Sequence, residues 1–163
     1  MKNQNFKKLV MFEKKIWPLW PILMITGVFL PWLRLRHSYQ TVSGVSQYSE
    51  EFSGWALAHT NLSNSFNLFS LAPYIFLIFG TFLLIPLIIN GVYKKDFRGT
   101  APCIAFSVLC VILAIMSIFH LYNLKLPAGT DYEVEYGIYV TLLSGFMITI
   151  DLLRVRKEKR EEK

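Results

Sequence analysis

The sequence is poor in cysteine: its 163 residues include only two, Cys103 and Cys110. If both lie on one helix, their spacing separates them by about 10 Å along the axis, which is too far for a disulfide between them. No Cys-x-x-Cys pair is present. A disulfide-stapled scaffold and a dithiol redox enzyme are therefore excluded.

Charged residues are missing from four long apolar stretches, each close to the ~20 residues that cross a bilayer. We predict membrane-spanning helices over residues 16–33, 71–92, 100–122 and 137–153. The expected fold class is an all-α integral membrane protein, an antiparallel four-transmembrane-helix bundle that forms a single domain over 1–163. No ionisable residue lies near the middle of a span, which argues against a proton-coupled carrier. A channel and a protein that handles neutral lipid remain as alternatives.

Positive charge is concentrated in three segments of the chain. The net charge is +6, and 14 of the 17 Lys and Arg residues lie in the tail 1–15, the loop 93–99 and the tail 154–163. Cytoplasmic segments of membrane proteins carry such an excess. We therefore predict that both termini are cytoplasmic in a multi-pass protein of the cell membrane, with the other two loops outside. The basic tails are expected to attract anionic inner-leaflet lipid, and no nucleic-acid partner is expected.

Catalytic motifs are lacking as well. The glycines form no phosphate-binding loop. Three serines within the expected spans, Ser107, Ser117 and Ser144, have no candidate base on their own helices. At such depth serines pack and hydrogen-bond. The sequence therefore predicts no enzymatic activity.

The three histidines are the remaining candidates for a metal site. His37, His59 and His120 all fall on the predicted outer side, where three histidines and a carboxylate could hold zinc. They come from separate segments and match no compact ligand spacing, so we predict polar residues at the membrane surface instead. Haem would require histidines inside the spans. We expect no cofactor and no metal.

The first outer loop carries a strand-like pattern. Residues 33–37 alternate apolar and polar side chains, which predicts a strand leaving the membrane. Gly44 lies in a segment typical of a strand or turn, and Trp55 anchors a second short apolar piece. A small β-hairpin or sheet that rests on the bundle is therefore expected in this loop.

Small residues recur at helical spacing in the last two spans, a pattern that lets helices approach closely in lipid. On the fourth span, Gly137, Thr141 and Gly145 recur every four residues. On the third, a heptad-like seam predicts a left-handed crossing; it comprises Cys103, Ser107, Cys110, Ala114 and Ser117. These residues are candidates for contacts within the bundle or with a partner.

Two tryptophan motifs resemble those of claudin-like tetraspan membrane proteins. Leu30-Pro31-Trp32 ends the first span, and Ser53-Gly54-Trp55 follows in the outer loop. The resemblance implies a left-handed four-helix bundle whose outer loop forms a small sheet that serves association, with Trp32 and Trp55 as outer anchors. The two loop cysteines of that family are missing here, so its paracellular barrier function does not carry over. The chain is also similar to small uncharacterised four-span proteins of prokaryotes.

The function predicted from these features is association in the membrane without enzymatic activity. The protein would be an accessory subunit of a membrane complex or a self-assembling surface element, with a homo-oligomer or other membrane subunits as partners. The alternatives are a small transporter, channel or immunity-type protein, and a membrane enzyme that handles lipid or quinone.

Overall fold

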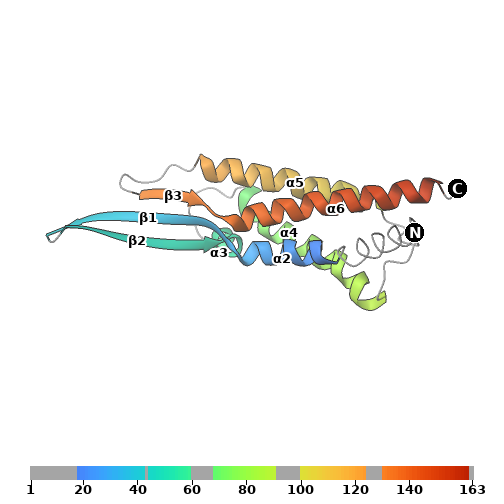
Figure 1. The fold of residues 1–163 in the computed structure, drawn as a ribbon, viewed down its shortest axis with the longest axis horizontal. Helices are drawn as coiled ribbons and strands as arrows, with labels where there is room; N and C mark the ends of the chain where they lie inside the picture. The colour runs from blue at the N-terminus through green and yellow to red at the C-terminus, as the bar shows by residue number, and fades with distance from the viewer. Residues whose placement is uncertain (1–17, 43, 60–67, 91–99, 124–129, 162–163) are drawn as a thin grey trace, which may run out of the picture.

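The computed structural model of this chain describes residues 18–42, 44–59, 68–90, 100–123 and 130–161. Helices make up most of the described chain, and a small sheet accompanies them (Figure 1). In chain order the elements are α2 (Leu19–Phe29), β1 (Pro31–Thr41), β2 (Gly44–Ser53), α3 (Gly54–His59), α4 (Leu68–Asn90), α5 (Thr100–Tyr122), β3 (Thr130–Val134) and α6 (Tyr136–Glu161).

The long helices lie side by side, and the sheet continues beyond one end of them (Figure 1). α6 packs against both α2 and α5, and α4 packs against α2 and α5. The strands run along the same long axis as the helices, so the hairpin of β1 and β2 projects away from the bundle (Figure 1). The basic end of α6 lies at the opposite end of the molecule.

The expected sheet is present, and it has one strand more than a hairpin. Its strands are antiparallel in the order β2-β1-β3. β1 pairs with β2 along its length from Leu33 to Thr41, whereas β3 covers β1 only from Leu33 to His37. Among the described residues no third strand pairs with the hairpin beyond His37, so this part is a two-stranded ribbon.

The prediction for the first span was wrong at its end. Helix was expected up to residue 33, but α2 ends at Phe29 and β1 begins at Pro31. Proline disfavours helical backbone in the residue before it, and Leu30 is extended, with φ −74° and ψ 157°. Trp32 and Leu33 consequently belong to the sheet. The predicted tail 1–15 and residues 16–17 lie outside the described residues.

The last helix is longer than predicted. We expected a span ending at residue 153 and a separate basic tail, but α6 continues to Glu161. Lys, Arg and Glu are good helix formers, and opposite charges one turn apart support the helix. Arg154 lies 3.8 Å from Asp151, and Lys157 lies 3.9 Å from Glu161.

Two helices are long and apolar enough to cross a bilayer, and this finding points to a membrane protein. They are Ala101–Tyr122, with a mean hydropathy of 2.6, and Tyr136–Arg154, with 1.6. Only 33% and 39% of these stretches are buried inside the chain. Within the described residues, two further apolar helical stretches are shorter: Leu19–Phe29 and Ser70–Ile85. Two of the four predicted spans therefore qualify by length and composition.

The outward faces of the helices are apolar. Large hydrophobic side chains that are at least 40% exposed occur on each of the four long helices; they include Ile22, Phe29, Ile78, Phe82, Phe106, Ile112, Phe119, Leu143 and Phe146. A water-soluble protein rarely exposes apolar surface on this scale. Exposed apolar surface of this extent is typical of helices that contact lipid or another protein.

Candidate association site

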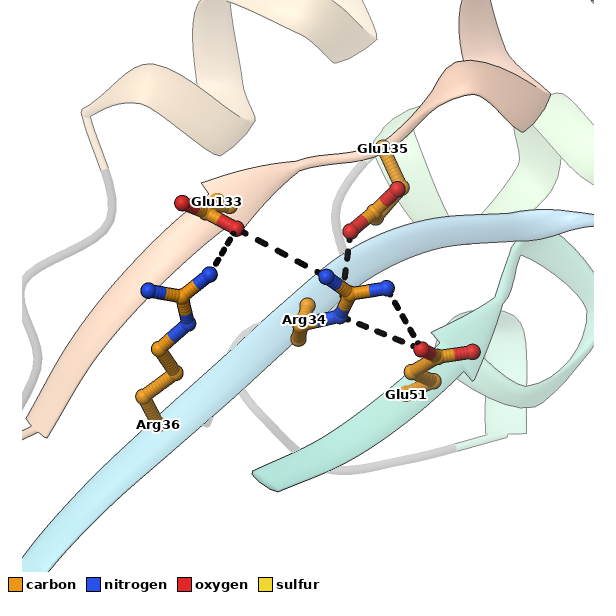
Figure 2. A network of polar contacts seen from close by, with 5 residues as sticks. All are labelled: Arg34, Arg36, Glu51, Glu133 and Glu135. Carbon is orange, nitrogen blue, oxygen red and sulfur yellow. Dashed lines mark hydrogen bonds and ion pairs between the residues drawn. The ribbon is translucent and has the colours of Figure 1, made fainter. Parts of the chain in front are cut away.

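Charged side chains gather on one face of the sheet, where β1 lies between β2 and β3 (Figure 2). The strand register places Arg34 opposite Glu51 and Glu133. Its guanidinium donates to Glu51 through Nη2 at 2.7 Å and lies 3.1 Å from Glu135 and 3.8 Å from Glu133. Arg36 donates to Glu133 at 2.7 Å. We call Arg34, Arg36, Glu51, Glu133 and Glu135 the Arg34 cluster. It connects β1 to both outer strands and to Glu135, the residue that precedes α6.

The Arg34 cluster is partly open to water. The side chain of Arg34 is 32% exposed, and that of Glu135 is 13% exposed. The hydrogen bond to Glu51 raises the pKa of the Arg34 guanidinium, and the charges of Glu135 and Glu133 act in the same direction. Ion pairs with this exposure are screened by water and add little stability. The cluster instead fixes which residue of β3 lies opposite each residue of β1.

Trp32 closes the end of α2. Pro31 has no N–H, so it cannot donate to the carbonyl of Gly27 four residues earlier, as a helical residue would. The indole Nε1 of Trp32 donates to that carbonyl at 2.7 Å. The ring is fully buried, and a Cβ atom at Gly54 or Gly137 would collide with it. Trp32 is therefore a buried contact between α2, the sheet and α6.

Trp55 lies at the surface in a cluster of aromatic rings. Its side chain is 38% exposed, and its ring centroid lies 4.6 Å from that of His59 and 5.3 Å from that of Tyr74. Both ring nitrogens of His59 have partners: Nδ1 lies 2.8 Å from the carbonyl of Trp55, and Nε2 lies 2.9 Å from the hydroxyl of Tyr74. Since a carbonyl can only accept, Nδ1 donates the hydrogen bond to Trp55. The cluster fixes α3 against α4.

The outer part of the hairpin carries no charge. From Ser38 to Ser49 there is no Asp, Glu, Lys, Arg or Pro. The first six residues of β2, Gly44–Ser49, are all exposed. Large apolar or aromatic side chains here are open to solvent: Tyr39 is 56% exposed, Val45 66% and Tyr48 55%. We call the stretch Ser38–Ser49 the neutral ribbon.

The small residues of α6 face inward. Gly137 and Thr141 lie against α2, where a Cβ atom at Gly27 would collide with the Thr141 hydroxyl and lie 3.2 Å from the Gly137 carbonyl. Gly145 lies against α5, with its Cβ position 3.3 Å from Val111. These three candidates are therefore used within the bundle.

The seam of α5 is also internal. Each of its residues is at most 5% exposed; they are Cys103, Ser107, Cys110, Ala114 and Ser117. The hydroxyl of Thr149 on α6 donates to that of Ser107 at 3.1 Å, and Ser107 donates to the carbonyl of Ile104. Of all the residues proposed for association, Trp55 is the one that the structure leaves exposed.

The described residues offer little for catalysis. The hydroxyls of Ser107 and Ser144 donate to carbonyls of their own helices. Among the described residues, no three His, Cys, Asp or Glu side chains gather closely enough for a metal ion. His37 lies 3.2 Å from the hydroxyl of Thr130, and His120 lies on α5.

A recess of about 460 Å³ opens beside β3 and the end of α5. It is lined by Tyr122, Tyr132, Glu133, Val134 and Glu135. The hydroxyl of Tyr132 donates to the carbonyl of Tyr122 at 2.6 Å, which holds β3 to α5. Two of the lining carboxylates belong to the Arg34 cluster.

No protein-family model, curated protein or solved structure matches this chain.

The sequence reasoning missed β3 and therefore the Arg34 cluster. The predicted spans 100–122 and 137–153 left residues 123–136 without an assigned element, yet Thr130–Val134 form a strand. The signal was the alternation of Tyr132 and Val134 with Asp131 and Glu133, the same pattern that identified β1.

Proposed function

We propose that this protein is a non-enzymatic integral membrane protein that works by association through its projecting sheet. Four helices cross the bilayer, both tails are cytoplasmic and the sheet is outside. The observation that carries the proposal is the neutral ribbon, which extends away from the helices and is exposed along β2. A chain that only needed to fold would gain nothing from exposing such a long uncharged hairpin.

The direction of the helices supports this topology. The stretch Gly137–Ile150 of α6 has no charged residue, and Arg154, Arg156 and Lys157 follow it at the end far from the sheet. Basic residues remain on the cytoplasmic side. The sheet end, which carries the Arg34 cluster, then lies on the outer side.

Membrane-impermeant thiol labelling tests the topology. Single cysteines replace Ser46 on the hairpin and Lys157 on α6, with Cys103 and Cys110 changed to alanine. In intact cells we expect labelling at position 46, and labelling at position 157 only after lysis. Labelling of position 157 in intact cells would refute the proposed orientation.

Crosslinking in native membranes tests the association. A lysine-reactive linker is applied before detergent extraction and should trap the protein in a larger species. On the proposed outer side it reacts with Lys125, which lies outside the described residues. A variant without Ser38–Ser49, joined by Asn-Gly, is the control and should remain monomeric. A wild-type chain that stays monomeric and without partners would contradict the proposed function.

The recess beside β3 supports a second candidate function, the binding of a lipid headgroup. The recess lies at the outer end of α5, at the level where headgroups would be, and it is lined by phenols and carboxylates. Co-purified lipid identified by mass spectrometry, lost in a Tyr122→Ala variant and retained in an Ile115→Ala variant, would favour this alternative.

A further inference from the structure

The free edge of β2 is not protected against pairing with another strand. Exposed edges normally carry Lys, Pro or a bulge that prevents edge-to-edge contact. The neutral ribbon contains no Lys and no Pro, and the irregularity in the register of β1 and β2 lies at the base, between Pro31 and Leu33. The outer half of β2 is therefore a regular strand with an open edge.

Backbone N–H and C=O groups of successive residues in a strand point to alternate sides, and this alternation shows which groups face the edge. The N–H of Glu135 donates to the carbonyl of Trp32 at 2.9 Å, so even-numbered residues of β1 point toward β3 and odd-numbered ones toward β2. His37, an odd-numbered residue of β1, lies opposite Tyr48, so the even-numbered residues of β2 point toward β1. Consequently the N–H and C=O groups of Val45, Gln47 and Ser49 point away from β1, toward the open edge.

We infer that β2 of one molecule pairs antiparallel with β2 of a second copy that stands in a facing membrane, with Gln47 opposite Gln47. This inference rests on the proposed function and names its partner. In this register Val45 lies opposite Ser49 of the second copy, so three residue pairs use the outward backbone groups.

Charge selects the antiparallel arrangement. In a parallel pair of identical strands every residue meets itself, so Glu50 and Glu51 would each oppose a like charge. Like charges directly opposite in a sheet are destabilising. In the antiparallel register centred on Gln47, Glu50 lies opposite Gly44, and neutral residues meet neutral residues.

The direction of the hairpin sets the two copies in opposite membranes. β2 runs along the same axis as the helices (Figure 1). Two antiparallel copies of β2 therefore point their helices in opposite directions, which places them in two bilayers that face each other. Copies in one membrane would present β2 in parallel.

The contact is small, and the membrane compensates for that. Stable interfaces bury about 800 Å² on each partner, more than a six-residue strand edge offers. Many copies on two facing surfaces act together, since each contact raises the effective concentration for the next. We expect membranes to be joined although the protein is monomeric in detergent.

Disulfide trapping between vesicles tests the register. Proteoliposomes with the hairpin outward carry single cysteines in the background lacking Cys103 and Cys110. Antiparallel pairing brings Gln47→Cys within about 5.5 Å of itself, a distance that suits a disulfide. Ser49→Cys, the matched control, is about 14 Å from its own copy along the strands. A vesicle population with Val45→Cys should crosslink to one with Ser49→Cys.

These outcomes decide the proposal. Dimers of Gln47→Cys between vesicles, none of Ser49→Cys, and mixed dimers of the other pair support it. Self-linking of Ser49→Cys as efficient as that of Gln47→Cys overturns it, and so does the lack of any dimer.

A charge exchange repeats the test without cysteines. Tethering of vesicles is followed by light scattering. Vesicles that carry only Gln47→Lys or only Gln47→Glu should give a signal at least tenfold smaller than wild-type vesicles. A mixture of the two variants should recover the wild-type signal. Tethering by Gln47→Lys at the wild-type level overturns the pairing. If the wild type associates within native membranes but tethers no vesicles, this inference fails and the proposed function stands; if it does neither, both fail.

Discussion

Gly137 gives the sharpest prediction on stability, because the space around it is bounded by backbone. A Cβ atom at this position would lie 2.6 Å from the carbonyl oxygen of Pro31, 2.7 Å from Cδ1 of Trp32 and 2.8 Å from the carbonyl oxygen of Leu30. None of these atoms is the end of a flexible side chain. The Gly137→Ala variant must therefore move α6 away from the start of β1.

The size of the effect follows from these contacts. Overpacking a filled core costs about 1–3 kcal/mol. Alanine recovers at most about 1 kcal/mol of helix propensity in a helix interior, and less at the second residue of α6. We expect Gly137→Ala to be destabilised by about 1–3 kcal/mol, which lowers the melting temperature by about 2–12 °C for a chain of this length.

Gly145 is the matched control on the same helix. Its Cβ position meets side-chain atoms, Cγ2 of Val111 at 3.3 Å and the methyl group of Met24 at 3.4 Å. Gly145→Ala should therefore melt within about 2 °C of the wild type. The assay is thermal unfolding of the purified protein in detergent, followed by tryptophan fluorescence. A Gly137→Ala variant as stable as Gly145→Ala would refute the close contact of α6 with Pro31.

Three further predictions concern the sheet and the seam. Arg34→Gln should loosen the pairing of β3 with β1 slightly, so hydrogen exchange of the β3 amides becomes somewhat faster, whereas Arg36→Gln, which loses one close pair, should change it less; equal rates in both variants would contradict the central role of Arg34. Trp32→Phe leaves the Gly27 carbonyl without its indole donor and should cost about 1–3 kcal/mol in thermal unfolding, and no loss would show that another group satisfies the carbonyl. Ala114→Leu should overpack the seam and lower the free energy of unfolding by about 1–3 kcal/mol. Ile115→Leu at the exposed face should leave the stability unchanged, and equal melting temperatures of the two variants would place Ala114 outside the seam.

The elements that the sequence predicted correctly are those with a strong local signal. The third and fourth apolar helices follow from uncharged stretches long enough to cross a bilayer. The strand after the first helix follows from alternation that begins at Leu33. In each case the signal lies within one continuous stretch of the chain.

The sequence left open which surface each small residue would face. Gly137 and Thr141 carry the same pattern whether they meet α2 or another protein, because periodicity defines a face of a helix and not its partner. The structure places them against Gly27. The sequence also left the burial of Trp32 open, since it depends on the Gly27 carbonyl that Pro31 leaves without a donor.

By itself the sequence determined where the chain is apolar and where it is charged, since these depend on residue type along the chain. Only the tertiary structure decided that β3 pairs with β1 and that Arg34 meets Glu51, Glu133 and Glu135. The contacts between β1 and β3 join segments almost 100 residues apart. They form because packing of α2 against α6 brings the strands together, and no local pattern encodes that packing.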